Sequence, residues 1–180
     1  MNSNVERLRV PHAELIGFVS LVFQRLGQPE KDSDTAARVL VSADLRGVES
    51  HGVVRLSPHG WYVKAFREGQ INPKPNIRVL QETPASALLD GDGGMGMVVG
   101  LRATELAIKK ARGAGVGMVA VHNSRHFGMS GYYSMQALEH DMIGIAMTNA
   151  SRQVVPTFGR EAKYGTNPIS LAAPAGEELP

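Results

Sequence analysis

Asn72-Pro73-Lys74-Pro75 is the stretch that decides the fold of this chain, because it separates two kinds of sequence. Two prolines within four residues cannot continue a helix, and the residue before each proline is restricted to extended backbone. Apolar residues at helical spacing precede the stretch, and short apolar runs alternating with helical patterns follow it. The sequence therefore predicts an α/β protein, with a helical part over residues 1–74 and an α/β part over residues 75–180.

Three helices are predicted before the prolines. The first covers residues 10–26, where the apolar positions repeat at helical spacing and Gly27 ends the helix. The second begins near the cap cluster Asp32-Ser33-Asp34 and ends at Gly47. The third is expected to begin at Ser57-Pro58 and to end at Gly69.

Strands and helices alternate after the prolines. Short strands are predicted over residues 77–80 and 85–90, buried strands over 116–121 and 143–147, and helices over 97–112 and 131–140. A last apolar run covers residues 169–173. The order strand, helix, strand, helix, strand implies some parallel pairing within one covered sheet.

The composition excludes several classes of protein. With 43% hydrophobic and 20% charged residues and no run of eighteen apolar residues, the sequence predicts a soluble globular chain without a membrane span or a signal peptide. The net charge of +2 argues against nucleic acid as a partner. The absence of cysteine excludes disulfides and thiolate sites and is consistent with a cytoplasmic location.

Ser50-His51-Gly52-Val53-Val54-Arg55 is the first candidate site. An imidazole can move a proton, and a guanidinium four residues further on can hold a carboxylate in a bidentate pair. Together the two groups indicate chemistry on a small acid. Ser50 adjoins His51, but no G-x-S-x-G motif of a hydrolase is present.

The stretch from Gly91 to Gly96 satisfies the dinucleotide pattern G-x-G-x-x-G between a predicted strand and a predicted helix. A dinucleotide fold also requires an acidic residue at the end of the following strand, and that strand ends Val121-His122-Asn123. We therefore expect the glycines to serve a tight turn and close helix packing rather than a Rossmann fold.

Three loops after strands form further candidates. Asn123-Ser124-Arg125-His126-Phe127-Gly128 lies at the carboxyl end of a strand, where His126 is a candidate proton donor, a ligand contact or an ordinary loop histidine. Residues 147–151 and 164–168 contain small hydrogen-bonding side chains and suggest one ligand surface, such as that for a ribose and its phosphates. A metal bound by His51, His59, His122 and His126 has only weak spacing evidence, and no metal site is predicted.

The motif from Ala43 to Leu56, the loop 123–128 and Gly165-Thr166-Asn167-Pro168 together resemble the malate/L-lactate dehydrogenase family of non-Rossmann oxidoreductases. That family includes ureidoglycolate, sulfolactate and diketogulonate enzymes and cyclic imino-acid reductases. The resemblance begins at about Val10. It implies hydride transfer between NAD or NADP and a small 2-hydroxy acid, 2-oxo acid or cyclic imino acid. It also implies a homodimer and a mixed sheet.

The resemblance also implies roles for individual residues. His51 is expected to act as general acid and base with Ser50 as its relay partner, and Arg55 is expected to hold the substrate carboxylate. His126 has the position of a cofactor contact that serves as the proton acceptor in some members. The other residues implied to bind the cofactor are Phe127, Gly128, Asn149 and Ala150, and Asn167 is implied to bind the substrate.

The chain departs from the family pattern in two ways. Relatives usually have a tyrosine four residues after the arginine, whereas here that position is His59 and Tyr62 follows three residues later. Family members are also about twice as long, so we expect this sequence to be an N-terminal portion with an incomplete sheet. A catalytically inert module for binding or dimerisation is the alternative function.

Overall fold

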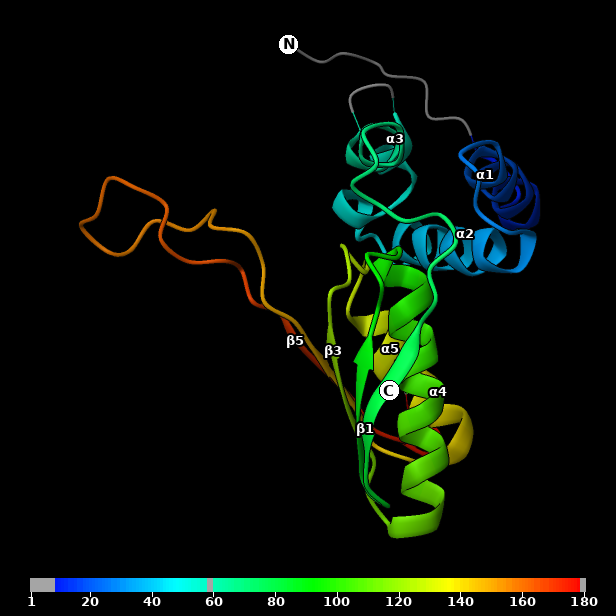
Figure 1. The fold of residues 1–180 in the computed structure, drawn as a ribbon, viewed down its shortest axis with the longest axis vertical. Helices are drawn as coiled ribbons and strands as arrows, with labels where there is room; N and C mark the ends of the chain where they lie inside the picture. The colour runs from blue at the N-terminus through cyan, green and yellow to red at the C-terminus, as the bar shows by residue number, and fades with distance from the viewer. Residues whose placement is uncertain (1–8, 58–59, 179–180) are drawn as a thin grey trace.

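The computed structural model describes residues 9–57 and 60–178. Three helices, α1 (His12–Arg25), α2 (Glu30–Leu45) and α3 (Trp61–Arg67), gather at one end of an elongated molecule (Figure 1). The predicted helices over 10–26 and near 61–69 are confirmed. Within the described residues, no helix combines the length and the apolar character that a bilayer crossing requires.

The start of α2 differs from the prediction. The helix begins at Glu30 behind the extended Pro29, and not at the Asp32-Ser33-Asp34 cluster. The amide of Ser33 donates to the carbonyl of Pro29 at 2.9 Å, which places Ser33 within the first turn. Asp32 instead forms an ion pair of 3.5 Å with Arg102. The acidic cluster therefore lies inside the helix, where it links α2 to a later helix.

The start of α3 also differs. The helix begins at Trp61 behind the extended Gly60, whereas the prediction placed its start at Ser57-Pro58. Ser57 ends the short 3-10 helix η2 (Val53–Leu56), and Pro58 lies outside the described residues. A Cβ on Gly60 would lie 2.1 Å from the carbonyl oxygen of Arg55. The chain therefore passes too close to itself at residue 60 for any larger side chain.

The α/β part contains a mixed sheet, as predicted. Strands β1 (Arg78–Glu82) and β2 (Ser86–Asp90) pair in antiparallel fashion, and β2 pairs in parallel with β3 (Met118–His122). The long helix α4 (Gly96–Ala114) connects the two parallel strands and packs against β3. The predicted parallel pairing is therefore confirmed, together with the crossover helix that such pairing requires.

The expectation of one covered sheet is wrong. After α5 (Gly131–Gln136) and the 3-10 helix η3 (Ala137–His140), strand β4 (Gly144–Met147) pairs with β5 (Ile169–Ala172) in a second, antiparallel sheet. Residues 148–168 between these strands form a long arm that extends away from the rest of the molecule (Figure 1).

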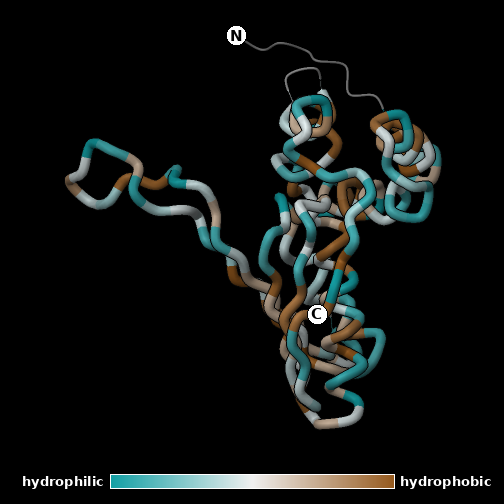
Figure 2. The backbone as a smooth tube through the Cα atoms, in the orientation of Figure 1, coloured by the Kyte–Doolittle hydropathy of each residue, from teal (hydrophilic) through white to brown (hydrophobic). Residues whose placement is uncertain are grey.

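Several strand positions that were predicted to be buried are exposed. Met118 is 66% exposed on β3, and Ile145 and Met147 are 59% and 64% exposed on β4. Apolar residues continue along the strands and into the arm, as Figure 2 shows. The reason is that α4 and α5 pack on these strands from one side only, and no other described element covers the opposite side.

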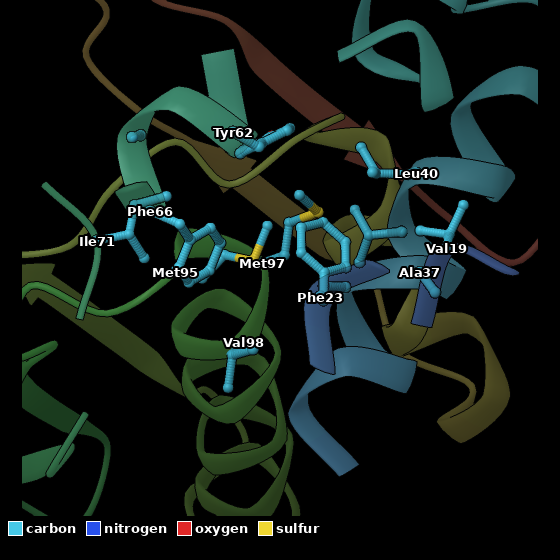
Figure 3. Close-up of a cluster of buried hydrophobic side chains, with 13 residues drawn as sticks. Val19, Phe23, Ala37, Leu40, Tyr62, Phe66, Ile71, Met95, Met97 and Val98 are labelled. Atoms are coloured by element: carbon cyan, nitrogen blue, oxygen red, sulfur yellow. The ribbon is translucent and has the colours of Figure 1, made fainter. Parts of the chain in front are cut away.

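The hydrophobic core lies where the three N-terminal helices meet the first turn of α4 (Figure 3). Phe23 and Tyr62 are at most 1% exposed and form an edge contact with ring centroids 6.3 Å apart. Met97 and Val98 of α4 belong to the same cluster. The core therefore includes residues from both sides of position 74, and the boundary between residues 1–74 and 75–180 stays a prediction.

The glycine-rich turn before α4 has the structural role that the sequence predicted. Gly93 adopts a positive φ of 66°, and α4 begins at Gly96. A Cβ on Gly96 would lie 1.9 Å from the carbonyl oxygen of Arg125. Glycine is therefore required at position 96 because the helix start packs directly on the backbone of the loop that carries His126.

Candidate active site

The first wall of the site is the segment of residues 49–56, which forms the 3-10 helices η1 (Glu49–His51) and η2 directly after α2. Asp44 fixes this segment, because its Oδ2 accepts a hydrogen bond of 2.9 Å from the amide of Val53. A Cβ on Gly52 would lie 1.8 Å from Oδ1 of the same carboxylate. The Gly52 in the motif thus lets the chain close around the Asp44 side chain.

Ser50, His51 and Arg55 lie together on this segment, as predicted. The Ser50 hydroxyl is 2.9 Å from Nδ1 of His51, and either atom can be the donor. Nε of Arg55 donates to the carbonyl of Ser50 at 2.5 Å. The terminal nitrogens of Arg55 have no hydrogen-bond partner among the described residues, so the paired N–H groups that suit a carboxylate are available.

The second wall is the loop 123–128, at the carboxyl end of β3. The hydroxyl of Tyr133 on α5 donates to the carbonyl of Phe127, and the two rings stack with centroids 4.9 Å apart. Gly128 adopts a positive φ of 78°, where a Cβ would lie 2.8 Å from Val39 on α2. The loop is therefore held by α2, α4 and α5 together.

The two walls meet at His51 and His126. Their imidazoles stack with centroids 5.5 Å apart and an angle of 22° between the rings. Trp61 adds a third ring, with its centroid 6.1 Å from that of His126. Although His51 and His126 are 75 positions apart in the sequence, the fold brings them into direct contact. This contact joins two motifs that the sequence could only describe separately.

The surroundings of both histidines favour the neutral imidazole. Partial burial, the neighbouring His51 and the charge of Arg55 lower the pKa of His126 to about 4. Partial burial and the same Arg55 charge lower the pKa of His51. Residue 126 as a whole is exposed, although its ring lies against the rings of Trp61 and Tyr62. The site thus presents two uncharged imidazoles beside one permanent cation.

Tyr62 is a site residue to which the sequence analysis gave no role, beyond noting its displacement from the family position. Its hydroxyl lies 2.7 Å from Nδ1 of His126, and the amide of Gly128 donates to the same nitrogen at 3.2 Å. The only signal in the sequence was that Tyr62 follows Arg55 at an unusual distance. The partner in the contact is 64 positions away, so local sequence could not reveal it.

Asn149, Ala150 and Asn167 form a separate group at the base of the arm. The amide of Ala150 donates to Oδ1 of Asn167 at 2.9 Å, which joins the two loops that follow β4 and precede β5. No hydrogen bond or ring contact among the described residues connects this group with His51 or His126. The roles of these three residues in binding cofactor or substrate stay predictions.

The described residues contain no group of three or more histidine, aspartate or glutamate side chains arranged to bind a metal ion. His51 and His126 are in contact, and His122 ends β3. His59, the fourth histidine considered with them, lies outside the described residues.

The second wall fits a nicotinamide in part. The group needs a flat surface and hydrogen-bonding partners for its amide, and the rings around His126 supply the flat surface. The amide of Gly128 and the carbonyl of Phe127 are already paired, with His126 and Tyr133 respectively. Contacts from Phe127 and Gly128 to a cofactor would therefore come from the Phe127 ring and the Gly128 carbonyl.

Comparisons with known proteins identify the family of this chain. A family model described as malate/L-lactate dehydrogenase matches residues 10–180. A malate dehydrogenase from Pyrococcus abyssi is 53% identical over 93% of this chain and 45% of its own length. An L-sulfolactate dehydrogenase from Methanocaldococcus jannaschii is 50% identical over 84% of this chain and 43% of its own length.

The fold also matches solved structures. The structure of malate dehydrogenase from Pyrococcus horikoshii superposes with a TM-score of 0.90 and 51% sequence identity, covering 95% of this chain and 48% of that one. The chain thus spans about half the length of the relatives it matches.

Proposed function

Because the chain belongs to the malate/L-lactate dehydrogenase family, we propose that it takes part in hydride transfer between NAD or NADP and a small 2-hydroxy or 2-oxo acid. A malate-like acid is the preferred substrate, since the relatives described above are named for malate and sulfolactate. A cyclic imino acid remains the second substrate class. The observation that carries the proposal is the stacking of His51 on His126 beside Arg55.

Each residue of the site has a physical task in this proposal. Arg55 holds the carboxylate of the acid through its terminal nitrogens, which have no partner among the described residues, while its Nε remains bound to the Ser50 carbonyl. His51 exchanges a proton with the substrate oxygen, and the Ser50 hydroxyl orients the ring through Nδ1. NAD or NADP, when bound beside His126, supplies or accepts the hydride.

Neutral histidines suit this task. A His51 ring with a lowered pKa is uncharged at neutral pH, so it can accept the proton of a 2-hydroxy acid during oxidation. In the reverse direction the same ring returns the proton to the substrate oxygen. Arg55 stays charged throughout, which separates the binding of the carboxylate from the movement of the proton.

Asn149, Ala150 and Asn167 are proposed to complete the cofactor and substrate surface from the base of the arm. We further propose a homodimer, which the family resemblance implies, and a cytoplasmic location, with which the absence of cysteine is consistent.

The experiment is NADH binding and turnover by the purified chain. NADH binding is followed by fluorescence titration, and oxidation of NADH with the 2-oxo acid that corresponds to malate is followed by absorbance. His51→Ala is expected to reduce turnover by about 10²-fold or more, the effect of losing a general acid or base. His12→Ala, an exposed histidine at the start of α1, serves as the matched control and retains wild-type turnover.

The alternative is an inert module for binding or dimerisation. It is favoured by the exposed apolar side of β4 and β5, where Ile169 and Leu171 are 74% and 67% exposed. Absence of NADH binding at millimolar concentration would support this alternative. Full turnover by His51→Ala would instead show that the role given to His51 is wrong.

A further inference from the structure

We propose that Tyr62 is a positioning residue that, together with the Gly128 amide, fixes His126 as the tautomer with its proton on Nε2. In this form His126 donates a hydrogen bond to the substrate oxygen and leaves the proton exchange to His51. The catalytic part of this inference rests on the function proposed above, whereas the tautomer is a property of the chain alone.

The first step follows from two contacts at a single nitrogen. The amide of Gly128 lies 3.2 Å from Nδ1 of His126, and a backbone amide can only donate. Nδ1 must therefore be the unprotonated nitrogen that accepts. The hydroxyl of Tyr62, 2.7 Å from the same nitrogen, must donate as well. In a neutral imidazole the remaining proton is then on Nε2.

The second step concerns the rigidity of Tyr62. The residue is 1% exposed and lies in the core, where its ring contacts Phe23 and Trp61 at centroid distances of 6.3 Å and 5.3 Å. Burial raises the pKa of Tyr62 above its ordinary value, so the hydroxyl keeps its proton. The core therefore holds a permanent donor at a fixed place beside Nδ1 of His126.

The third step concerns the opposite nitrogen. Nε2 of His126 has no hydrogen-bond partner among the described residues, and the His51 ring stacks on the His126 ring at an angle of 22°. A neutral imidazole can polarise a carbonyl oxygen through one N–H group without giving up the proton. Nε2 could accept a proton only if the ring first carried its own proton on Nδ1 instead. The two donors at Nδ1 oppose that form of the ring.

These steps divide the work between the two histidines. His51 has a serine hydroxyl at Nδ1, which can reverse its direction and support either protonation state of the ring. His126 has an amide at Nδ1, which cannot reverse. His51 is therefore suited to exchange protons, and His126 to donate one unchanging hydrogen bond.

The test is long-range ¹H–¹⁵N correlation spectroscopy of the full chain with ¹⁵N-labelled histidine. His126 in the wild type is expected to show a pyrrole-type shift at Nε2 and a pyridine-type shift at Nδ1 near neutral pH. Tyr62→Phe keeps the buried ring and removes the hydroxyl, and is expected to move both shifts toward the averaged values of a free histidine. Tyr132→Phe, a half-buried tyrosine packed against the same core, is the matched control.

Two outcomes overturn the inference. One is a wild-type His126 with its proton on Nδ1 or with fully averaged shifts. The other is a Tyr62→Phe spectrum in which His126 is unchanged from the wild type. A measurement without any variant gives a second check, because a protected Tyr62 hydroxyl proton should show a nuclear Overhauser contact to His126.

Turnover separates this inference from the proposed function. If the chain is active, Tyr62→Phe should reduce kcat by about tenfold with little change in KM, since one hydrogen bond to a reacting group is altered. If the chain shows no NADH binding, the proposed function fails while the spectrum still decides the tautomer. If the chain is active and the tautomer is absent, only the inference about Tyr62 fails.

Discussion

Gly96→Ala tests whether the first turn of α4 positions the loop that carries His126. A Cβ at this position would lie 1.9 Å from the carbonyl oxygen of Arg125 and 2.7 Å from two backbone atoms of His126. Because these are main-chain atoms, no rotation of a side chain can relieve the contact. The helix and the loop must separate by about 1 Å or more to reach a normal carbon–oxygen distance.

The magnitude follows from two opposing effects. Alanine in a helix is more stable than glycine by up to about 1 kcal/mol, and forced overpacking costs about 1–3 kcal/mol or more. Gly113→Ala in the same helix provides the matched control, because nothing lies within 4 Å of the position of its Cβ. We expect Gly113→Ala to stabilise the chain by up to about 1 kcal/mol and Gly96→Ala to destabilise it by about 2 kcal/mol.

The assay is urea unfolding, followed by circular dichroism and by the fluorescence of Trp61. Trp61 is the single tryptophan of the chain and lies beside His126, so its emission in the native state reports the loop directly. Gly96→Ala should change this native emission, and Gly113→Ala should leave it unchanged. Equal stability and equal emission of the two variants would refute the argument that α4 holds the loop.

Four further predictions concern ionisation, the pH dependence of stability, burial and pairing. Arg55→Met should raise the pKa values of His51 and His126 in NMR titrations, since the Arg55 charge contributes to both lowered values. Because a lowered pKa means that the unfolded chain binds more protons, His126 should weaken stability as the pH falls from about 6.5 toward about 4, and urea midpoints across that range should decrease. Phe23→Ala, at a fully buried position, should cost about 3–5 kcal/mol in urea unfolding, whereas Phe158→Ala on the exposed arm should cost almost nothing. Lys110→Met should cost about 1–3 kcal/mol because Lys110 is only 8% exposed and its ammonium group binds the carbonyl of Thr83 at 2.6 Å. Lys109→Met on the exposed side of the same helix should be close to neutral.

Local sequence patterns predicted the positions of helices and strands better than they predicted which of these elements contact one another. The apolar spacing that includes Val19 and Phe23 was enough to locate α1, and the glycine-rich turn was correctly interpreted as a site of close packing. The start of α2 was misplaced because Asp32 and Ser33 have the chemistry of capping residues, although Pro29 already provides the extended residue before the helix. A cap cluster and a polar first turn look alike until the preceding backbone is known.

The sequence predicted the separate motifs of the site but not their arrangement in space. His51 and His126 were both selected, but their stacking depends on how β2, β3 and α4 are connected, which no local pattern encodes. Tyr62 was noted only as a tyrosine displaced from the family position, whereas it is a core residue whose hydroxyl also reaches the site. The separate sheet of β4 and β5 was missed because apolar runs indicate strands without indicating their partners.

The core shared by α1, α2, α3 and the first turn of α4 has a consequence for the lifetime of the site. Tyr62 belongs to this core and its hydroxyl contacts the loop at His126, so we expect the amide of Gly128 to exchange slowly with deuterium. Backbone amides at the tip of the arm around Phe158 are outside that core and should exchange early. The chain would then combine a long-lived His126 environment with an arm whose backbone amides exchange independently of the core.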